Sequence, residues 1–577
     1  MIASLIEAVT AAAVTAALRP NIAAAPRPNI ALLFMDDHGW GDLGANTGTP
    51  ALTPEMDKLA ADGLRFTDFH VAFSVCTPSR GALLTGRYGA RTGITSNFGP
   101  ESMHGMATGE LTIANVLSSV GYEAAMIGKW HLGHNEPHHP TYRGFSSFFG
   151  LPYSGDMGCL DDVPQGCRPE WDRSKGQPAC PALCPDDGGS GGCGSRGGSA
   201  EGSCVAIPLY DTMGSDCAGR ECSDSISQAP FHTHALNSAY ARRARELISM
   251  HSNSSDASPL FLYLAFAHTH TPLAYEARWE NATARGDHSA VFANTLAELD
   301  WAVGQVTQAA DDSGASWLLW LAADNGPADL ASVACDSVGR PGPFVGAWQR
   351  TGGGGGASCK GTTWEGGHRV ASIAYWRGVI SPGVVNGLVH TLDMLPTFAA
   401  LAGASLEAYG RAFDGADLSA LLTRGDESEL HERIIFHQSD DGQLNAMRVG
   451  QYKLFWETAG ARDGCRINAT HSRWPGGGGK VAHDPPLVFD LHADPGESRP
   501  LTNLPVGLLQ RAQEARAAKQ LSISTTMRSS TDYSVGGRAY WPCANRSSAC
   551  CRLHSSALAS TSATTRHGKT PEVSSYV

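Results

Sequence analysis

The stretch Asn-Ile-Ala-Leu-Leu-Phe-Met-Asp-Asp, residues 29–37, is an apolar run of strand length that ends abruptly in two carboxylates. The run Ile30–Met35 is continuous rather than alternating in hydrophobicity, which is typical of a strand buried on both faces. Such strands belong to parallel or mixed sheets that helices cover on both sides. The stretch therefore predicts an α/β protein in which Asp36 and Asp37 follow a buried strand.

The same pattern, a strand-like run followed directly by polar and chemically reactive residues, occurs three more times. It is found in Ala124–Ile127 before Gly128-Lys129-Trp130-His131, in Leu260–Ala267 before His268-Thr269-His270, and in Trp317–Ala323 before Asp324-Asn325-Gly326. In parallel and mixed sheets, ligands bind beyond the carboxyl ends of the strands. We therefore predict a large mixed, mostly parallel sheet flanked by helices, with these four polar segments at one edge.

A different pattern begins after about residue 376. Short strand-like runs appear there, and two of them are separated only by Gly450-Gln451, which is a hairpin signal. The runs are Ile434–His437, Ala446–Val449, Tyr452–Trp456 and Leu487–Leu491. We expect a large first domain over 27–375 and a smaller antiparallel C-terminal subdomain over 376–551. Residues 159–230 are predicted to be a Cys/Gly-rich, disulfide-pinned insertion, and the Ser/Thr/Ala-rich residues 552–577 a disordered tail.

The composition excludes several classes of protein. Of 577 residues, 42% are hydrophobic, which is enough for a substantial core and excludes wholesale disorder. The 43 Lys and Arg against 56 Asp and Glu give a net charge of −13, so nucleic acid is not an expected partner. No apolar run reaches the ~18 residues that a membrane-spanning helix needs.

Several features favour a secretory route. Eight of the 15 cysteines lie between Cys159 and Cys222, and N-x-[ST] sequons begin at Asn253, Asn281, Asn468 and Asn545. The apolar segment Ala8–Leu18 with small residues after it is typical of a signal peptide, so we expect residues 1–26 to be a cleaved signal. The alternative is a disordered Ala-rich leader. A secreted, glycosylated protein of an extracellular or lysosome-like compartment is predicted.

The segment Cys-Thr-Pro-Ser-Arg-Gly-Ala-Leu-Leu-Thr-Gly-Arg, residues 76–87, carries the candidate nucleophile. Pro78 suits the first turn of a helix, which places Cys76 at a helix N-terminus where backbone N–H groups favour an anion. Arg80 follows one turn later, with a guanidinium that fits a tetrahedral oxyanion. The alternative is that Cys76 is an ordinary disulfide cysteine.

A candidate metal site is formed by Asp36, Asp37, Asp324 and Asn325. These residues offer only oxygen ligands, which Ca²⁺ and Mg²⁺ prefer and zinc does not. Each pair alone is also a good turn sequence, but both pairs follow buried-type strands. The excess negative charge can be offset by Arg80, Lys129 and Lys360.

Two segments resemble the signature of the sulfatase family. The first is Cys76-Thr77-Pro78-Ser79-Arg80-Gly81 with Thr85-Gly86-Arg87 further on, and the second is Gly128-Lys129-Trp130-His131-Leu132-Gly133. The resemblance runs from about Pro28 to Glu497 and is closest to the branch of arylsulfatase A and galactosamine-6-sulfatase. Residues 159–222 diverge from that branch, with more cysteines and glycines.

The resemblance implies a catalytic sulfatase domain over 27–375 with an alkaline-phosphatase-like fold that hydrolyses sulfate monoesters. It implies that a formylglycine-generating enzyme oxidises Cys76 to formylglycine, that the cation is Ca²⁺, and that residue 76 is also a metal ligand. The implied catalytic residues are Cys76, Arg80, Lys129, His131, His270 and Lys360, and the implied substrate-binding residues are Ser154, Lys129, His270 and Lys360.

Cysteine and histidine assignments depend partly on this resemblance. Strand alternation predicts that one of His268 and His270 faces the site, and the resemblance selects His270. It also implies a disulfide between Cys359 and Cys465. Removing Cys76 from an odd count of 15 leaves fourteen cysteines that can pair. Lys360, taken alone, could equally be a solvated loop lysine.

Two other functions remain open from the sequence. A phosphomonoesterase or phosphodiesterase of the alkaline-phosphatase-like group would use a Ser or Thr nucleophile and two zinc ions, which this sequence does not offer. A non-catalytic sulfatase-like binding protein is the other. A homo-oligomer is possible, and the natural sulfate ester is not indicated.

Overall fold

The computed structural model describes most of the chain between residues 27 and 553. The described residues are 27–48, 52–157, 207–212, 225–228, 231–254, 258–280, 290–328, 339–352, 355–430, 432–439, 441–460, 479–526, 528–537, 540, 542 and 552–553. The predicted signal peptide, most of the Cys/Gly-rich insertion and nearly all of the predicted tail lie outside these residues.

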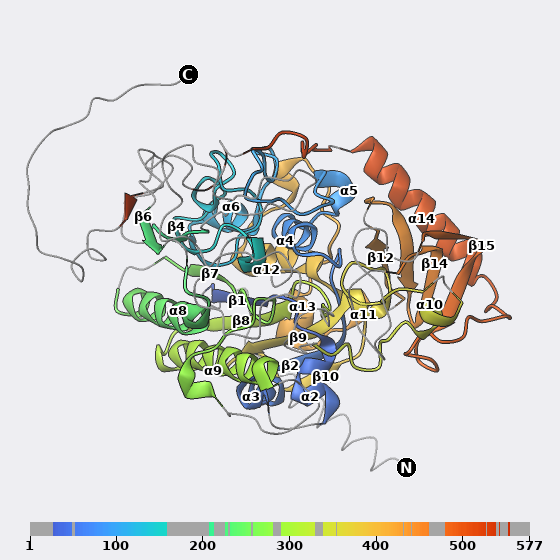
Figure 1. The fold of residues 1–577 in the computed structure, drawn as a ribbon. Helices are drawn as coiled ribbons and strands as arrows, with labels where there is room; N and C mark the ends of the chain where they lie inside the picture. The colour runs from blue at the N-terminus through green and yellow to red at the C-terminus, as the bar shows by residue number, and fades with distance from the viewer. Residues whose placement is uncertain are drawn as a thin grey trace, which may run out of the picture.

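A large mixed sheet forms the centre of the molecule (Figure 1). Its strand order among the described residues is β10-β2-β9-β8-β1-β7-β3-β4-β5-β6-β16, with β11 also paired to β2. The strands are β1 (Asn29–Met35), β2 (Leu64–His70), β3 (Glu123–Gly128), β4 (Ser147–Gly150), β5 (Leu209–Asp211), β6 (Ser225–Gln228), β7 (Leu260–Ala265), β8 (Trp317–Ala323), β9 (Arg369–Trp376), β10 (Gly383–Val385), β11 (Val389–His390) and β16 (Arg552–Leu553).

The central part of this sheet is parallel. β1 lies between β7 and β8 and runs parallel to both, and β3 runs parallel to β7. All seven residues of β1 are buried, as a strand covered on both faces requires. The prediction of a mixed, mostly parallel sheet is confirmed, with antiparallel pairing at β2–β9, β8–β9, β4–β5 and β5–β6.

The register of the parallel strands brings their polar ends together. Met35 of β1 is opposite Ala323 of β8, so Asp36 and Asp324 leave the sheet side by side. Gly128 at the end of β3 has φ +106° and lies so close to β7 that a Cβ atom would be 1.8 Å from Ala265 O. Only glycine fits this position, and it lets the chain turn toward Lys129 at the same edge.

Helices cover both faces of the sheet (Figure 1). One layer contains α3 (Pro54–Asp62), α8 (Leu236–Ser252) and α9 (Ala290–Asp312), and the other contains α4 (Cys76–Thr85), α6 (Ile113–Ser118) and α12 (Met394–Ala402). Shorter helices are α2 (Gly44–Thr47), α5 (Gly89–Thr92), α10 (Ala347–Thr351), α11 (Glu365–His368) and α13 (Ser419–Arg424). None of the helices in the described part of the chain is long and apolar enough to cross a membrane.

A separate four-stranded antiparallel sheet lies beside the large one, as predicted (Figure 1). It consists of β12 (Ile434–Gln438), β13 (Leu444–Val449), β14 (Tyr452–Thr458) and β15 (Val481–Asp490), and α14 (Leu508–Thr525) packs on it. β10 and β11, although beyond residue 375, belong to the large sheet. The proposed division of the chain near residue 376 stays a prediction, and the antiparallel sheet itself starts at Ile434.

Candidate active site

The predicted site residues meet at the carboxyl edge of the parallel strands. Asp36 and Asp37 follow β1, Asp324 and Asn325 follow β8, and Lys129 follows β3. Cys76 is the first residue of α4, as its position before Pro78 predicts. The segments that contain His131, Ser154, His270 and Lys360 also reach this edge of the sheet and contact the site.

Four side chains are close enough together to share a metal ion. One ligand atom each from Asp36, Asp37, Cys76 and His270 lies within 4.8 Å of the others, and all four residues are buried. Asn325 Oδ1 is buried beside them without a hydrogen-bond partner among the described residues. A bound cation would satisfy this amide oxygen and the carboxylates, so this buried acidic group could hold a metal ion.

Asp324 stands somewhat apart from that group because hydrogen bonds engage both of its oxygens. Its Oδ1 accepts from the backbone N–H of Asp37 at 3.1 Å, and its Oδ2 accepts from Arg80 Nη2 at 2.8 Å and Nε at 3.1 Å. Burial and the charge of Asp36 raise the pKa of Asp324 to about 6. The Arg80 contact fixes this carboxylate at the edge of the site.

Three cations balance the three carboxylates. Lys129 Nζ lies 2.5 Å from Asp36 Oδ2, and Lys360 Nζ lies 2.5 Å from Asp37 Oδ1 and 3.4 Å from Cys76 Sγ. Burial alone would raise the pKa of Asp36, but the charges of Lys129, His270 and Arg80 hold it well below its usual value. Lys360 is therefore part of the site and not a solvated loop residue.

Cys76 is a free, buried thiol, so the alternative of a structural disulfide at this position is wrong. Its Sγ lies 3.6 Å from Asp36 Oδ1. Burial raises the pKa of the thiol to about 12, although Lys129 and Lys360 oppose the shift. Because only the thiolate is a good nucleophile, burial makes the unmodified side chain a weak nucleophile at neutral pH.

His131 is held in one orientation and one tautomer. Its backbone has φ +62°, a left-handed conformation, and its N–H donates to Pro152 O at 3.0 Å. The Nε2 atom lies 3.0 Å from Phe98 O, and since a carbonyl only accepts, Nε2 carries the proton. The buried Nδ1 has no hydrogen-bond partner in the described part of the chain and is left as an acceptor.

His270, not His268, faces the metal group. The prediction that strand alternation separates the two histidines is wrong, because residues two apart in a strand share a face, and β7 ends earlier than predicted, at Ala265. His270 Nδ1 lies 2.5 Å from Thr271 O and 3.3 Å from Ser154 Oγ, which leaves Nε2 facing Asp37 Oδ2 at 3.7 Å.

One polar residue of this edge was missed in the sequence. Asp156 follows Ser154 closely, and its Oδ1 is buried without a hydrogen-bond partner among the residues described. Burial opposes the shift, but the charges of His270 and Lys129 lower the pKa of Asp156. The only signal was an acidic residue just beyond the Leu151–Ser154 segment.

Only one cysteine of the predicted disulfide lies within the described residues. Cys359 is disulfide-bonded, and position 465, its predicted partner, lies outside the described residues.

Comparisons with known proteins agree with this geometry. A sulfatase family model matches residues 28–404, and a model of the C-terminal region of aryl-sulfatase matches residues 430–553. Arylsulfatase G of Rattus norvegicus is 40% identical over 499 residues, covering 84% of this chain and 83% of the relative. Arylsulfatase A of Homo sapiens is 36% identical over 520 residues, covering 88% of this chain and 89% of the relative.

A solved structure, that of the PsFucS1 sulfatase from Pseudoalteromonas sp., has the same fold. Its TM-score is 0.68 at 23% identity, over 88% of this chain and 92% of that chain. At this identity the likeness supports the fold alone.

An α/β fold with buried lysine, arginine and carboxylate side chains gathered beyond its parallel strands is typical of a hydrolase of tetrahedral oxyanion esters. Within that class, the chain belongs to the sulfatase family. It is a sulfuric ester hydrolase, as its arylsulfatase relatives are.

Proposed function

We propose that this sulfatase cleaves sulfate monoesters with formylglycine at position 76 and a single divalent cation, Ca²⁺. The observation that carries the proposal is the environment of Cys76, a free thiol at the start of α4 between Asp36 and Lys360. A thiol whose pKa is raised to about 12 is poorly suited to attack sulfur itself. A hydrated aldehyde at the same position has two hydroxyl groups instead.

The proposed metal ligands are Asp36, Asp37, Asp324, Asn325 and residue 76. The unpartnered Asn325 Oδ1 and the carboxylates of Asp36 and Asp37 support a hard cation, and residue 76 would join them through a hydroxyl oxygen rather than a thiolate once it is formylglycine. When bound, the cation supplies positive charge that favours ionisation of the attacking hydroxyl and offsets the charge on sulfate.

The first step is attack on sulfur. One hydroxyl of the diol gives its proton to Asp324 and forms a bond to sulfur as the bond to the ester oxygen breaks. The departing oxygen takes a proton from His270 or Lys360. Lys129, Lys360, Arg80 and Ser154 hold the sulfate oxygens and the ester in place.

The second step releases sulfate from the enzyme. His131 Nδ1, an acceptor because Nε2 donates to Phe98 O, takes the proton of the second hydroxyl. The aldehyde C=O re-forms, the bond from carbon to the sulfate oxygen breaks, and inorganic sulfate leaves. A serine ester would have no second hydroxyl for this elimination.

Mass spectrometry of the peptide containing residue 76 tests the proposal. In active protein we expect the aldehyde, and a fully active preparation with only the unmodified thiol would overturn it. Cys76→Ser should keep the fold, lose turnover by about 100-fold or more, and accumulate a sulfated serine. The matched control is Ser79→Ala, which removes a hydroxyl from the same helix and should keep the modification.

We also propose a secretory route, with maturation by a formylglycine-generating enzyme. Asn253, the first residue of a sequon, is exposed next to the end of α8, which supports access for glycosylation. The other three sequons lie outside the described residues.

A further inference from the structure

A segment near the C-terminus lies along the stretch of chain that follows α5. Residues 528–537, here called the C-terminal strap, follow α14 and run along residues 91–103. Ser529 N–H donates to Arg91 O at 2.8 Å, and Met103 N–H donates to Val535 O at 3.2 Å. Ser102 and Gly536 form an isolated antiparallel bridge. The strap is therefore hydrogen-bonded to this part of the large domain at both ends.

Tyr533 lies in the middle of the strap, and its hydroxyl makes all of its hydrogen bonds to the backbone of residues 95 and 96. The Oη atom accepts from the backbone N–H groups of Thr95 at 3.1 Å and Ser96 at 3.2 Å, and it donates to Ser96 O at 3.2 Å. One donor and two acceptor positions are all that a phenol has. Its ring also stacks on Phe98, with centroids 5.0 Å apart and planes at 17°.

The segment that Tyr533 holds makes two contacts with the active site. Phe98 O accepts from His131 Nε2 at 3.0 Å and so determines which nitrogen of His131 is free to take a proton. Asn97 Oδ1 accepts from the backbone N–H of Thr77 at 3.0 Å, next to residue 76. Thr77 Oγ1 in turn donates to His131 O at 2.8 Å.

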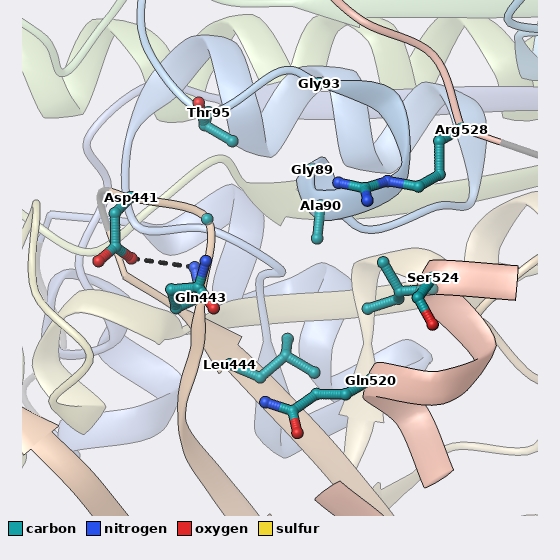
Figure 2. A pocket seen from close by; sticks show the side chains of 12 residues that line it. Gly89, Ala90, Gly93, Thr95, Asp441, Gln443, Leu444, Gln520, Ser524 and Arg528 are labelled. Carbon is teal, nitrogen blue, oxygen red and sulfur yellow. Dashed lines mark hydrogen bonds between the residues drawn. The ribbon is translucent and has the colours of Figure 1, made fainter. Parts of the chain in front are cut away.

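Part of the segment borders a cavity. Gly93 and Thr95 line a cavity of about 440 Å³ between α5, the β12–β13 turn and α14 (Figure 2). Across the cavity lie polar side chains, among them Asp441, Gln443 and Gln520 (Figure 2). Ile94 and Phe98 of the segment are buried in the core, so the strap supports the less buried part around Thr95 and Ser96.

We propose that Tyr533 is a positioning residue for His131 and, through it, for release of sulfate from residue 76. The inference rests on the proposed role of His131 in the second step. Tyr533 does not contact the reacting atoms. It acts by keeping Phe98 O where His131 Nε2 donates to it, because a misplaced carbonyl would allow the ring to turn or to change tautomer.

Stepwise variants test this inference. Tyr533→Phe removes the hydroxyl and keeps the ring stack, and Tyr533→Ala removes both. Because Tyr533 is 39% exposed, neither change opens a large core cavity, and folding should survive. Ser534→Ala is the matched control, since that hydroxyl bonds Asp532 within the strap itself.

The readouts are kcat, KM and the first turnover of a chromogenic aryl sulfate. If sulfate release becomes rate-limiting, kcat and KM fall together, roughly 10- to 100-fold for Tyr533→Ala and less for Tyr533→Phe. The first turnover then appears as a burst of phenol, and mass spectrometry finds residue 76 sulfated. Ser534→Ala should behave as the wild type.

His131→Asn separates the two possible failures. If His131→Asn gives the burst and Tyr533→Ala does not, the inference is overturned while the proposed function stands. If His131→Asn gives no burst, the proposed role of His131 is wrong and the inference falls with it. In the double variant, Tyr533→Ala should add little to His131→Asn, and full additivity of the two losses would also contradict the inference.

Discussion

At the scale of single residues, the site combines groups that would be unstable if separated. Asp36 and Asp37 are buried carboxylates, and each has a lysine within 2.5 Å. Taking such charges out of water is costly, and close partners offset the cost. Lys129 and Lys360 therefore stabilise the site, and in the proposed mechanism they also bind the sulfate group.

The metal assignment predicts the behaviour of Asp37→Ala. Loss of this ligand should abolish Ca²⁺ binding and lower kcat about 100-fold or more, because the cation and the side chains around it act as one unit. Elemental analysis after gel filtration would measure the ion. Wild-type protein in Ca²⁺ at 100 times its Kd should be about 2.7 kcal/mol more stable to unfolding than the same protein after EDTA has removed the ion.

The variant itself provides the contrast, because Asp37→Ala should unfold identically with and without EDTA. Asp300→Asn is the matched control: Asp300 is also a buried carboxylate, but it accepts backbone N–H groups of Glu55 and Met56 in α3. It should keep its Ca²⁺. Two zinc ions per wild-type chain would refute the assignment.

At the scale of elements, the small sheet is fastened to the large domain by buried charges. The Glu365 carboxylate of α11 accepts hydrogen bonds from Lys453 Nζ of β14 at 2.9 Å and from Arg448 Nη1 of β13 at 2.8 Å. His70, His437 and Glu365 lie close enough together to be a candidate metal site. The two cations already compensate the charge of Glu365, so a metal ion would be repelled there.

This fastening predicts a large effect of Glu365→Gln. The variant leaves Lys453 buried without its carboxylate partner and Arg448 with Asp68 alone, which should lower the free energy of unfolding by about 3–5 kcal/mol. Urea unfolding would measure it. Lys480→Ala, which breaks the exposed Lys480–Asp441 pair, should cost only about 0–1 kcal/mol. Equal losses in the two variants would contradict the prediction.

The elements also show how far a sequence alone leads. β1 and β8 and the residues after them were predictable because an apolar run and its polar end are adjacent in the chain. The strap was not, because Tyr533 and Thr95 are separated by 438 positions and no local pattern pairs them. β5 and β6 were missed for a related reason: they lie within the predicted insertion, are only 3 and 4 residues long, and are stabilised by the sheet edge.

At the scale of the whole molecule, stability depends on pH through groups that burial keeps neutral. His437 Nε2 lies 3.1 Å from His70 Nδ1, and its Nδ1 accepts from Lys453 Nζ at 2.5 Å. Its ring stacks on His368 at 4.1 Å. Burial and the charge of Lys453 hold the pKa of His437 well below its usual value, and burial and Lys453 lower that of His368 to about 3.

The sign of the effect follows from proton uptake. Below about pH 6.5 an unfolded chain protonates these histidines and the folded protein does not, so stability falls as the pH decreases. Each such histidine contributes about 1.4 kcal/mol per pH unit until its folded pKa is reached. Burial raises the pKa of Glu298 and of Asp300 to about 7, and these groups act in the opposite direction between about pH 7 and 4.

The variant His437→Gln measures how much one of these histidines contributes to the pH dependence of stability. Glutamine can still accept a hydrogen bond from Lys453, but it lacks the ring that stacks on His368, so the variant should be less stable than the wild type at pH 7. Because glutamine does not titrate, the variant should lose less stability on acidification. Between pH 6.5 and 5 the difference in free energy of unfolding should shrink by about 2 kcal/mol. Thermal unfolding at pH 5, 6 and 7 would measure it. Asp300→Asn should shift the profile the opposite way, because it removes a group that takes up its proton in the folded state. Parallel profiles for the wild type and His437→Gln would mean that the stacked histidines at the junction of the two sheets do not set the acid sensitivity of the molecule.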